Sequence, residues 1–302
     1  MNSENFKLRT AAFSDLPRLK YLWEQAFGEE KGFMDGFFEK RFEPDNTLIL
    51  ENKENGKLLS MLFVLPCKIK MFNGDIISAV NIVGVATDAE ERHRGYMTRL
   101  IDHCFGVLKS RDIKIAVLKP SNREFYEQYG FKVCNILYEA EIEPGIFKNN
   151  NFNAKVYHDI TPELIEKLDL IYSGCGYSGG KLLRTFDDWK FHLKGMAYTV
   201  VVIDNSAYHL CVEKCGKLIS SESLPMTQLP EALSAGGYAQ MLAGESVQMP
   251  TGKSVPLKIE EAVSIAPVYA DNVRKRGYTM YKMISGEDLE LENKTNLIFE
   301  QY

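Results

Sequence analysis

The clearest chemical signal in the sequence is a basic loop that contains a single glycine. It stands between an apolar run at residues 82–87 and a helix-like segment at residues 98–105, and it reads Arg92, His93, Arg94, Gly95, Tyr96, Met97. A helix N-terminus offers unpaired backbone N–H groups and a partial positive charge, which suit a phosphate or pyrophosphate. The pattern therefore predicts a strand, an anion-binding loop and a helix, and the loop is the candidate cofactor site.

The elements that lead to this loop are expected to begin with a β–α unit. A strand is expected at residues 6–9. A helix should follow, with capping side chains from Ser14 and Asp15 and with Pro17 in its first turn, where a missing N–H costs nothing. An aromatic-rich helix is then expected near residues 33–42, and its rings belong either to the core or to the wall of a substrate pocket.

Three strands should connect that helix to the loop. They are expected at residues 47–51, 58–71 and 76–87, and turns around Gly56 and Gly74 separate the second strand from its neighbours. This order predicts an antiparallel meander. Beyond the loop helix we expect a strand at residues 113–118, a short helix that ends at Gly130, and a strand at residues 131–142.

Together these elements predict a mixed α/β fold, with a mostly antiparallel sheet flanked by helices. A polar segment with Pro144 and a run of asparagines follows, and it marks the expected linker between a domain at residues 1–145 and a domain at residues 151–302. The second domain repeats the order of the first: a strand, a helix capped by Thr161, a second helix and a hairpin. Because identity between the halves is low, an internal repeat and an unrelated unit both remain open.

Composition limits the class of protein and its partners. With 302 residues, 45% hydrophobic and 25% charged, the chain is expected to be globular. No apolar run approaches the ~20 residues of a membrane helix, so we expect a cytoplasmic protein without a membrane partner. The six cysteines form no CxxC pair and the five histidines are scattered, so neither disulfides nor a metal site are expected. A net charge of −5 disfavours nucleic acid as a partner.

The basic loop, the strand before it and the segment after the next strand together resemble the GNAT superfamily of acetyl-CoA-dependent N-acetyltransferases. The resemblance covers about residues 6–142 and rests on Arg92, Gly95 and Met97, on Asn122, and on the run 125–131 that reads Phe-Tyr-Glu-Gln-Tyr-Gly-Phe. The family's loop usually ends in Gly or Ala, where this chain has Met97. The tandem second half further resembles the Eis-type branch, and the chain is expected to lack that branch's C-terminal sterol-carrier-like domain.

The resemblance implies acetyl-CoA as the co-substrate and assigns its contacts. The backbone N–H groups of the loop would cradle the pyrophosphate, with Arg92 and Arg94 adding charge. Val83 and Val85 would bond the pantetheine amides, so that the cofactor lies like an added strand. Asn122 is either a cofactor contact or a simple helix cap. The cofactor-binding residues implied are Val83, Val85, Arg92, His93, Arg94, Gly95, Tyr96, Met97 and Asn122.

For catalysis, the resemblance places the general acid at Tyr126. A phenol with a pKa of ~10 is protonated at neutral pH and can donate to a thiolate of pKa ~8.5. The alternative is that this tyrosine only packs in the core. No general base is apparent, because the strand at residues 76–87 has no carboxylate and its polar residues are Ser78, Asn81 and Thr87. A water relay or a carboxylate from another element is expected instead.

These assignments predict acetyl transfer to a primary amine of a small molecule or a peptide, in a ternary complex. The alternative is a non-enzymatic acyl-CoA-binding or regulatory module, motivated by Met97 and by the missing strand carboxylate. Transfer to a protein target within a complex and assembly as a homo-oligomer also stay open. The segment Arg274-Lys275-Arg276-Gly277 resembles the loop, but a strand-like sequence follows it, so no second cofactor site is expected.

Overall fold

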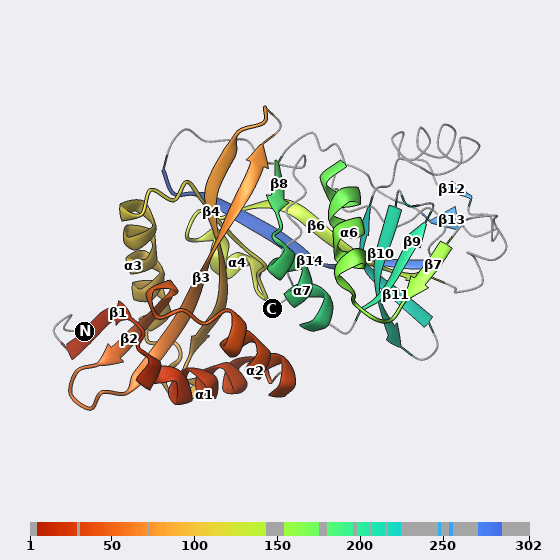
Figure 1. Ribbon diagram of the computed structural model, residues 1–302. Coiled ribbons are helices and arrows are strands. Elements are labelled where there is room, and N and C mark those ends of the chain that lie inside the picture. Colours follow the sequence, from red (N-terminus) through yellow and green to blue (C-terminus); the bar gives the residue numbers. More distant parts are fainter. Residues whose placement is uncertain are drawn as a thin grey trace. The chain divides into compact units, whose positions relative to one another are not determined.

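The central elements of the structure are two long antiparallel strands, β3 (Leu58–Met71) and β4 (Ile76–Thr87) (Figure 1). The structure is a computed structural model. It divides into two units, of which the first contains the chain up to Lys119 and the segment from Tyr281 to 285, and the second the chain from Pro120 to Met280. The described residues are 5–28, 31–71, 73–142, 154–174, 180–195, 198–203, 205, 207–214, 217–224, 247–248, 254–255 and 271–285.

In the first unit, β3 and β4 form a sheet with three further strands. β1 (Phe6–Thr10) pairs with β2 (Thr47–Asn52), and β2 pairs with β3, both antiparallel. β5 (Ile115–Leu118) pairs with β4 and is parallel to it. The sheet is therefore mixed and mostly antiparallel, as the sequence predicts. Gly56 and Gly74 have left-handed φ angles of +68° and +92°, which turns of this kind require.

Three helices pack on this sheet. α1 (Leu16–Phe27) and α2 (Lys31–Lys40) lie next to each other in Figure 1, apart from α3 (Tyr96–Ser110). The rings of Trp23, Phe37 and Phe38 gather around Phe63 of β3, with centroid distances of 5.2–5.7 Å to it. All four side chains are buried. The aromatic residues of α2 thus belong to the core, which was the first of the two expected roles.

A bulge interrupts the pairing of β3 and β4 beneath these rings. Between the pairs Met61–Ala86 and Phe63–Val83, β3 has one residue and β4 has two. Gly84 lies in the bulge with φ +59°, and a Cβ there would meet the rings of Trp23 and Phe63 at 2.6 Å. Only glycine fits this backbone at this distance from the rings.

The pairing of β4 with β5 is short. It runs from Ala79–Ile115 to Asn81–Val117, while β4 continues to Thr87. The six residues of β4 from 82 to 87 therefore have no register partner on β5. They lead directly to the basic loop, and this edge of β4 is open to an added strand-like group.

A distant segment completes the first unit. The backbone N–H of Ile284 donates to the carbonyl of Lys114 at 2.9 Å, and the hydroxyl of Ser285 donates to the carbonyl of Ile113 at 3.3 Å. These residues follow β14 (Asp271–Met283), a strand that contains the second basic segment. No helix begins behind that segment within residues 271–285, so it lacks the geometry of the first loop, as expected.

The second unit contains its own group of strands and its own core. Its helices are α4 (Arg123–Glu127), α6 (Pro162–Gly174) and α7 (Phe186–Gly195). Its strands include β6 (Lys132–Ile142), β7 (Ala154–Tyr157), β8 (Gly180–Leu183), β9 (Thr199–Ile203), β10 (Ala207–Lys214), β11 (Lys217–Leu224), β12 (Val247–Gln248) and β13 (Ser254–Val255). The order within the sheet is β6-β11-β10-β9-β7, antiparallel throughout.

The core of this unit forms where α6 and α7 cover β9 and β10. Trp189 is fully buried between Tyr172 and Tyr208, and its indole N–H donates to Asp169 at 2.9 Å. The Arg184 guanidinium lies 4.5 Å from the Trp189 ring centroid. Trp189 is thus a core residue with a satisfied N–H and a stacked cation.

Two expectations on local structure need correction. Asp15 precedes α1 but makes no capping hydrogen bond, because its carboxylate pairs with Arg9 at 2.7 Å and accepts the N–H of Ala12. The strand expected at residues 113–118 begins at Ile115. Thr161 does cap α6, accepting the N–H of Leu164 at 3.3 Å. The expected linker at residues 144–151 lies outside the described residues. Among the helices of the described residues, none is long and apolar enough to span a bilayer.

Candidate active site

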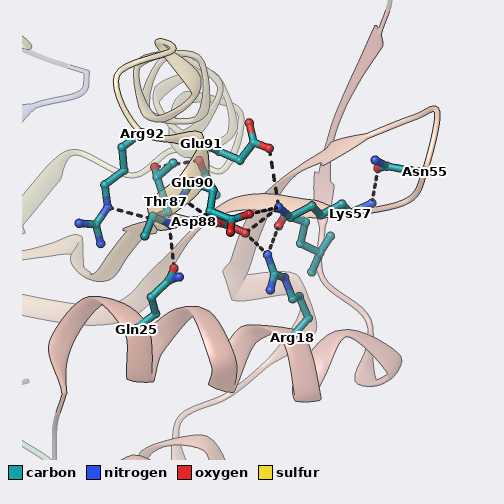
Figure 2. A network of polar contacts seen from close by, with 12 residues as sticks. Arg18, Gln25, Asn55, Lys57, Thr87, Asp88, Glu90, Glu91 and Arg92 are labelled. Carbon is teal, nitrogen blue, oxygen red and sulfur yellow. Dashed lines mark hydrogen bonds and ion pairs between the residues drawn. The ribbon is translucent and has the colours of Figure 1, made fainter.

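The loop between β4 and α3 is anchored by Asp88 (Figure 2). Asp88 caps the short 3-10 helix η4 (Ala89–Glu91) by accepting the N–H of Glu90 at 3.0 Å. Its buried carboxylate also forms ion pairs with Arg18 of α1 and, at 3.1 Å, with Lys57 of the β2–β3 turn. One side chain thus joins the start of the loop to two elements that lie far away in the sequence.

The two charges at the centre of this network stabilise each other. Burial is the largest single influence on the pKa of Asp88 and raises it. Lys57, the N–H of Glu90 and Arg18 together outweigh burial, so that the pKa lies below its usual 3.8. The hydrogen bond to Asp88 raises the pKa of Lys57 above its usual 10.5. Both groups are therefore charged at physiological pH, and the network holds the loop as an ionic anchor.

The loop backbone has the form of an anion-binding turn. His93 and Gly95 have left-handed φ angles of +63° and +73°. Gly95 is the N-cap of α3, and no side chain caps the helix there. Left-handed residues let a loop backbone turn its N–H groups toward a bound anion, and the uncapped first turn of a 15-residue helix adds its dipole. The role of the loop as a cofactor site stays a prediction.

Bonds within the loop hold its two arginine side chains. Arg92, His93 and Arg94 are exposed, but Arg94 pairs with Glu91 at 2.9 Å, and the Nε of Arg92 donates to the carbonyl of Thr87 at 3.3 Å. These bonds hold both arginines close to the loop.

Two further residues of the loop are partly or fully covered. Tyr96 is buried against Phe6 with ring centroids 5.0 Å apart, so it offers a ligand only its backbone N–H. Met97 is half-buried. Tyr96 therefore contributes to the packing of the first unit, while the exposed side chains of the loop are those of residues 92–94.

The strand residues expected to contact pantetheine lie on the open part of β4. Val83 and Val85 both follow Asn81, the last residue of β4 in register with β5. Val83 is buried and Val85 is half-buried. The bulge at Gly84 lies between them and turns the strand at this point. The arrangement leaves backbone groups of β4 for a ligand that runs along the strand.

The two downstream candidates belong to α4 in the second unit. The Oδ1 of Asn122 accepts the N–H of Phe125 at 3.2 Å, so Asn122 is a helix cap, one of its two expected roles. Tyr126 is buried and packs edge to face on Phe125 and Phe131. Burial raises the pKa of Tyr126 above its usual 10, which keeps the phenol protonated.

The polar residues of β4 differ in their environments. Ser78 is exposed, and Thr87 forms a 2.9 Å hydrogen bond with Ser60. Asn81 is 6% exposed, and its Oδ1 has no hydrogen-bond partner among the described residues. No group of three potential ligands that could hold a metal ion occurs in the described part of the chain.

Asp88 was not among the site residues predicted from the sequence. The available signal was the Asp-Ala-Glu-Glu pattern, in which Asp88 is a preferred N-cap residue with acidic residues behind it. Its partners Arg18 and Lys57 could not be found in this way, because they approach only in the folded chain.

Comparisons with known proteins address the family and the fold of the chain. Residues 7–134 match a family model described as an acetyltransferase (GNAT) domain. A comparison with curated protein sequences gave no match. Three solved structures share the fold at low identity: a GCN5-related N-acetyltransferase from Kribbella flavida, Eis1 from Mycobacterium abscessus, and a GCN5-related N-acetyltransferase from Anabaena variabilis.

The similarity to these structures extends over most of this chain. The Kribbella protein has a TM-score of 0.63 at 12% identity, over 94% of this chain and 72% of its own. Eis1 has a TM-score of 0.59 at 13% identity, over 92% of this chain and 73% of its own. The Anabaena protein has a TM-score of 0.61 at 15% identity, over 93% and 73%. Residues 7–134 therefore match a GNAT acetyltransferase domain, the solved structures share the fold of this chain, and this match supports an acyltransferase.

Proposed function

We propose that the protein transfers an acetyl group from acetyl-CoA to a primary amine. The observation that carries this proposal is the open end of β4: the strand leaves β5 after Asn81 and leads into a loop with two left-handed residues and an uncapped helix. A ligand with a pyrophosphate at one end and amide groups along its length matches these two features. Acetyl-CoA has both.

In this proposal the loop N–H groups of residues 92–97 hold the pyrophosphate, and the backbone of Val83 and Val85 bonds the pantetheine amides. The neutral amine attacks the thioester carbonyl carbon, the N–C bond forms and the C–S bond breaks. Tyr126 gives its proton to the departing thiolate and regains one from solvent; burial keeps the phenol protonated before the step, while its raised pKa makes it a weaker acid than a free tyrosine. The amine's own proton passes to water, because β4 has no carboxylate.

We also propose a tandem arrangement, in which residues 151–302 form a diverged, non-catalytic copy that contributes to the acceptor pocket. The support is the strand order: β7, β9 and β10 pair antiparallel in sequence order, as β1, β2 and β3 do. In both units two helices stand between the first and second of these strands. We place the reaction in the cytoplasm, where the thiols of Cys67, Cys104, Cys134 and Cys211, none of which forms a disulfide, would stay reduced.

The test combines binding with turnover on the full chain. Acetyl-CoA should raise the melting temperature, and free CoA thiol should appear with at least one member of a panel containing a polyamine, an aminoglycoside, a lysine peptide and a peptide with a free N-terminus. Binding without thiol release from any amine would support an acyl-CoA-binding regulatory module instead. Failure to bind acetyl-CoA would refute both functions.

A further inference from the structure

Asn81 is a polar residue in an apolar strand, and its side chain is unsatisfied. Its neighbours along β4, Val80 and Ile82, are buried apolar residues. The Asn81 side chain is itself buried, and its Oδ1 meets no donor among the described residues. A buried carbonyl oxygen without a donor costs stability, and buried amides are normally hydrogen-bonded. A group kept in this state is a candidate for bonding to a bound molecule.

Asn81 lies where the pairing of β4 with β5 ends. It is the last residue of β4 in register with β5, opposite Val117. Its antiparallel partner on β3 is Leu65, which is only half-buried. Residues opposite each other in such a pair share a face, and so do alternate residues of one strand. Asn81 therefore lies on the same face as Val83 and Phe63, the face that α1 and α2 cover.

This place corresponds to one end of the proposed cofactor. Read back from the loop at residues 92–97, the open edge of β4 passes Val85, then Val83, and ends at Asn81. An acyl-CoA whose pyrophosphate occupies the loop and whose pantetheine follows this edge brings its thioester end toward Asn81. This position of the thioester rests on the proposed function, because it follows from the proposed direction of the ligand.

We infer that Asn81 binds the acceptor amine, with its Oδ1 accepting an N–H of the attacking nitrogen. A carboxamide oxygen accepts a hydrogen bond but takes no proton at neutral pH, so Asn81 orients the amine and is not its base. The hydrogen bond directs the nitrogen lone pair at the thioester carbon. Orientation of this kind raises the rate of attack without changing the affinity for the acyl donor.

The test compares three variants of the full chain. Asn81→Leu removes the hydrogen-bonding group at similar size, and Asn81→Asp keeps an acceptor oxygen at the same place. Ser78→Ala is the matched control, since Ser78 is exposed on the other face of the same strand. For each we would measure the melting temperature, the shift produced by acetyl-CoA, and kcat/KM for an amine that the wild type acetylates.

We expect Asn81→Leu to keep the rise in melting temperature that acetyl-CoA produces. Its kcat/KM for the amine should fall at least about tenfold. Asn81→Asp should recover most of that loss, and Ser78→Ala should match the wild type. If Asn81→Leu does not accumulate as folded protein, Asn81→Ala gives the same comparison without added bulk. Recovery in the aspartate variant is the outcome that a purely structural role does not produce.

Several results would overturn the inference. Wild-type turnover by Asn81→Leu would show that the carboxamide does not act on the amine, while the proposed function would stand. An equal loss in the leucine and aspartate variants would exclude Oδ1 as the acceptor. A parallel loss of acetyl-CoA binding and turnover in Asn81→Leu would indicate a structural role. A wild type that binds acetyl-CoA but acetylates no amine would refute the proposed function, and the inference with it.

Discussion

The rings of Trp23 and Phe63 meet edge to face, with centroids 5.7 Å apart, directly over the backbone of Gly84. One ring comes from a helix and the other from β3, and both are buried. They hold the bulge of β4 at the point where the strand has separated from β5. Core packing and the shape of the proposed cofactor edge are therefore set by the same contact.

Gly84→Ala should destabilise the first unit by about 2–4 kcal/mol. The new Cβ would meet both rings at 2.6 Å, and an alanine at φ +59° is strained in addition. Chemical denaturation would measure the loss. Gly106→Ala is the matched control, because this helical glycine has open space around it, and it should be neutral or stabilising. An unchanged midpoint for Gly84→Ala would contradict the packing described here.

Gly95→Val should weaken acetyl-CoA binding by tenfold or more, with a smaller effect on folding. The position has φ +73°, which a β-branched residue avoids, so the loop N–H groups would turn away from their common point. Nothing lies within 4 Å of the added Cβ, so no core contact is lost. Titration calorimetry with acetyl-CoA would measure the affinity. If the variant bound acetyl-CoA with the affinity of the wild type, the loop would not be part of the cofactor site.

Tyr126→Phe should retain acetyl-CoA binding and lose turnover by about tenfold or more, the scale of general-acid assistance. The raised pKa of Tyr126 means that the phenol stays protonated well above neutral pH. The wild-type rate should therefore rise with pH as the acceptor amine loses its proton, without a decline below pH ~10 from this residue. Tyr129→Phe on the same segment serves as a control. A fully active Tyr126→Phe enzyme would reject the acid role.

Asp88→Asn should cost about 1–3 kcal/mol of stability at neutral pH, because it removes the buried carboxylate that pairs with Arg18 and Lys57, whose side chains are 28% and 31% exposed and stay partly solvated. The pKa of Asp88 is lowered in the folded state, so its contribution is complete above the unfolded value near 3.8 and is lost as the pH falls through the folded value. The difference between wild type and variant should therefore be constant from pH 5 to 8 and shrink below pH 4. Urea unfolding across this range would show it, and a difference that grows on acidification would contradict the assignment.

The regular elements of the first unit follow from local sequence. β3 and β4 were predicted at their observed bounds, because apolar runs of fitting length end in turns around Gly56 and Gly74. The loop and the start of α3 could also be predicted, since a glycine among basic residues before an amphipathic segment is a local signal. The same holds for the cap at Thr161.

Features that depend on side-chain contacts between different elements could not be predicted. Asp15 was expected to cap a helix and instead pairs with Arg9, which the fold of β1 brings beside it. The anchoring role of Asp88 depends on partners 70 and 31 positions away along the chain. The unsatisfied state of Asn81 appears only once the neighbouring strands are in place. A single sequence carries no local pattern for any of these.

The contact between residues 284–285 and residues 113–114 has a consequence for the order of folding. The hydroxyl of Ser285 reaches a carbonyl 172 residues earlier in the chain. During synthesis the amino-terminal part of the chain leaves the ribosome before residues 284 and 285 have been made. The carbonyl groups of residues 113 and 114 therefore lack these hydrogen bonds while the intervening chain is synthesised. Closing so large a loop is slow, and an exposed strand can pair with the wrong neighbour in the meantime. Completion of the first unit thus becomes a late event, after translation has passed residue 285.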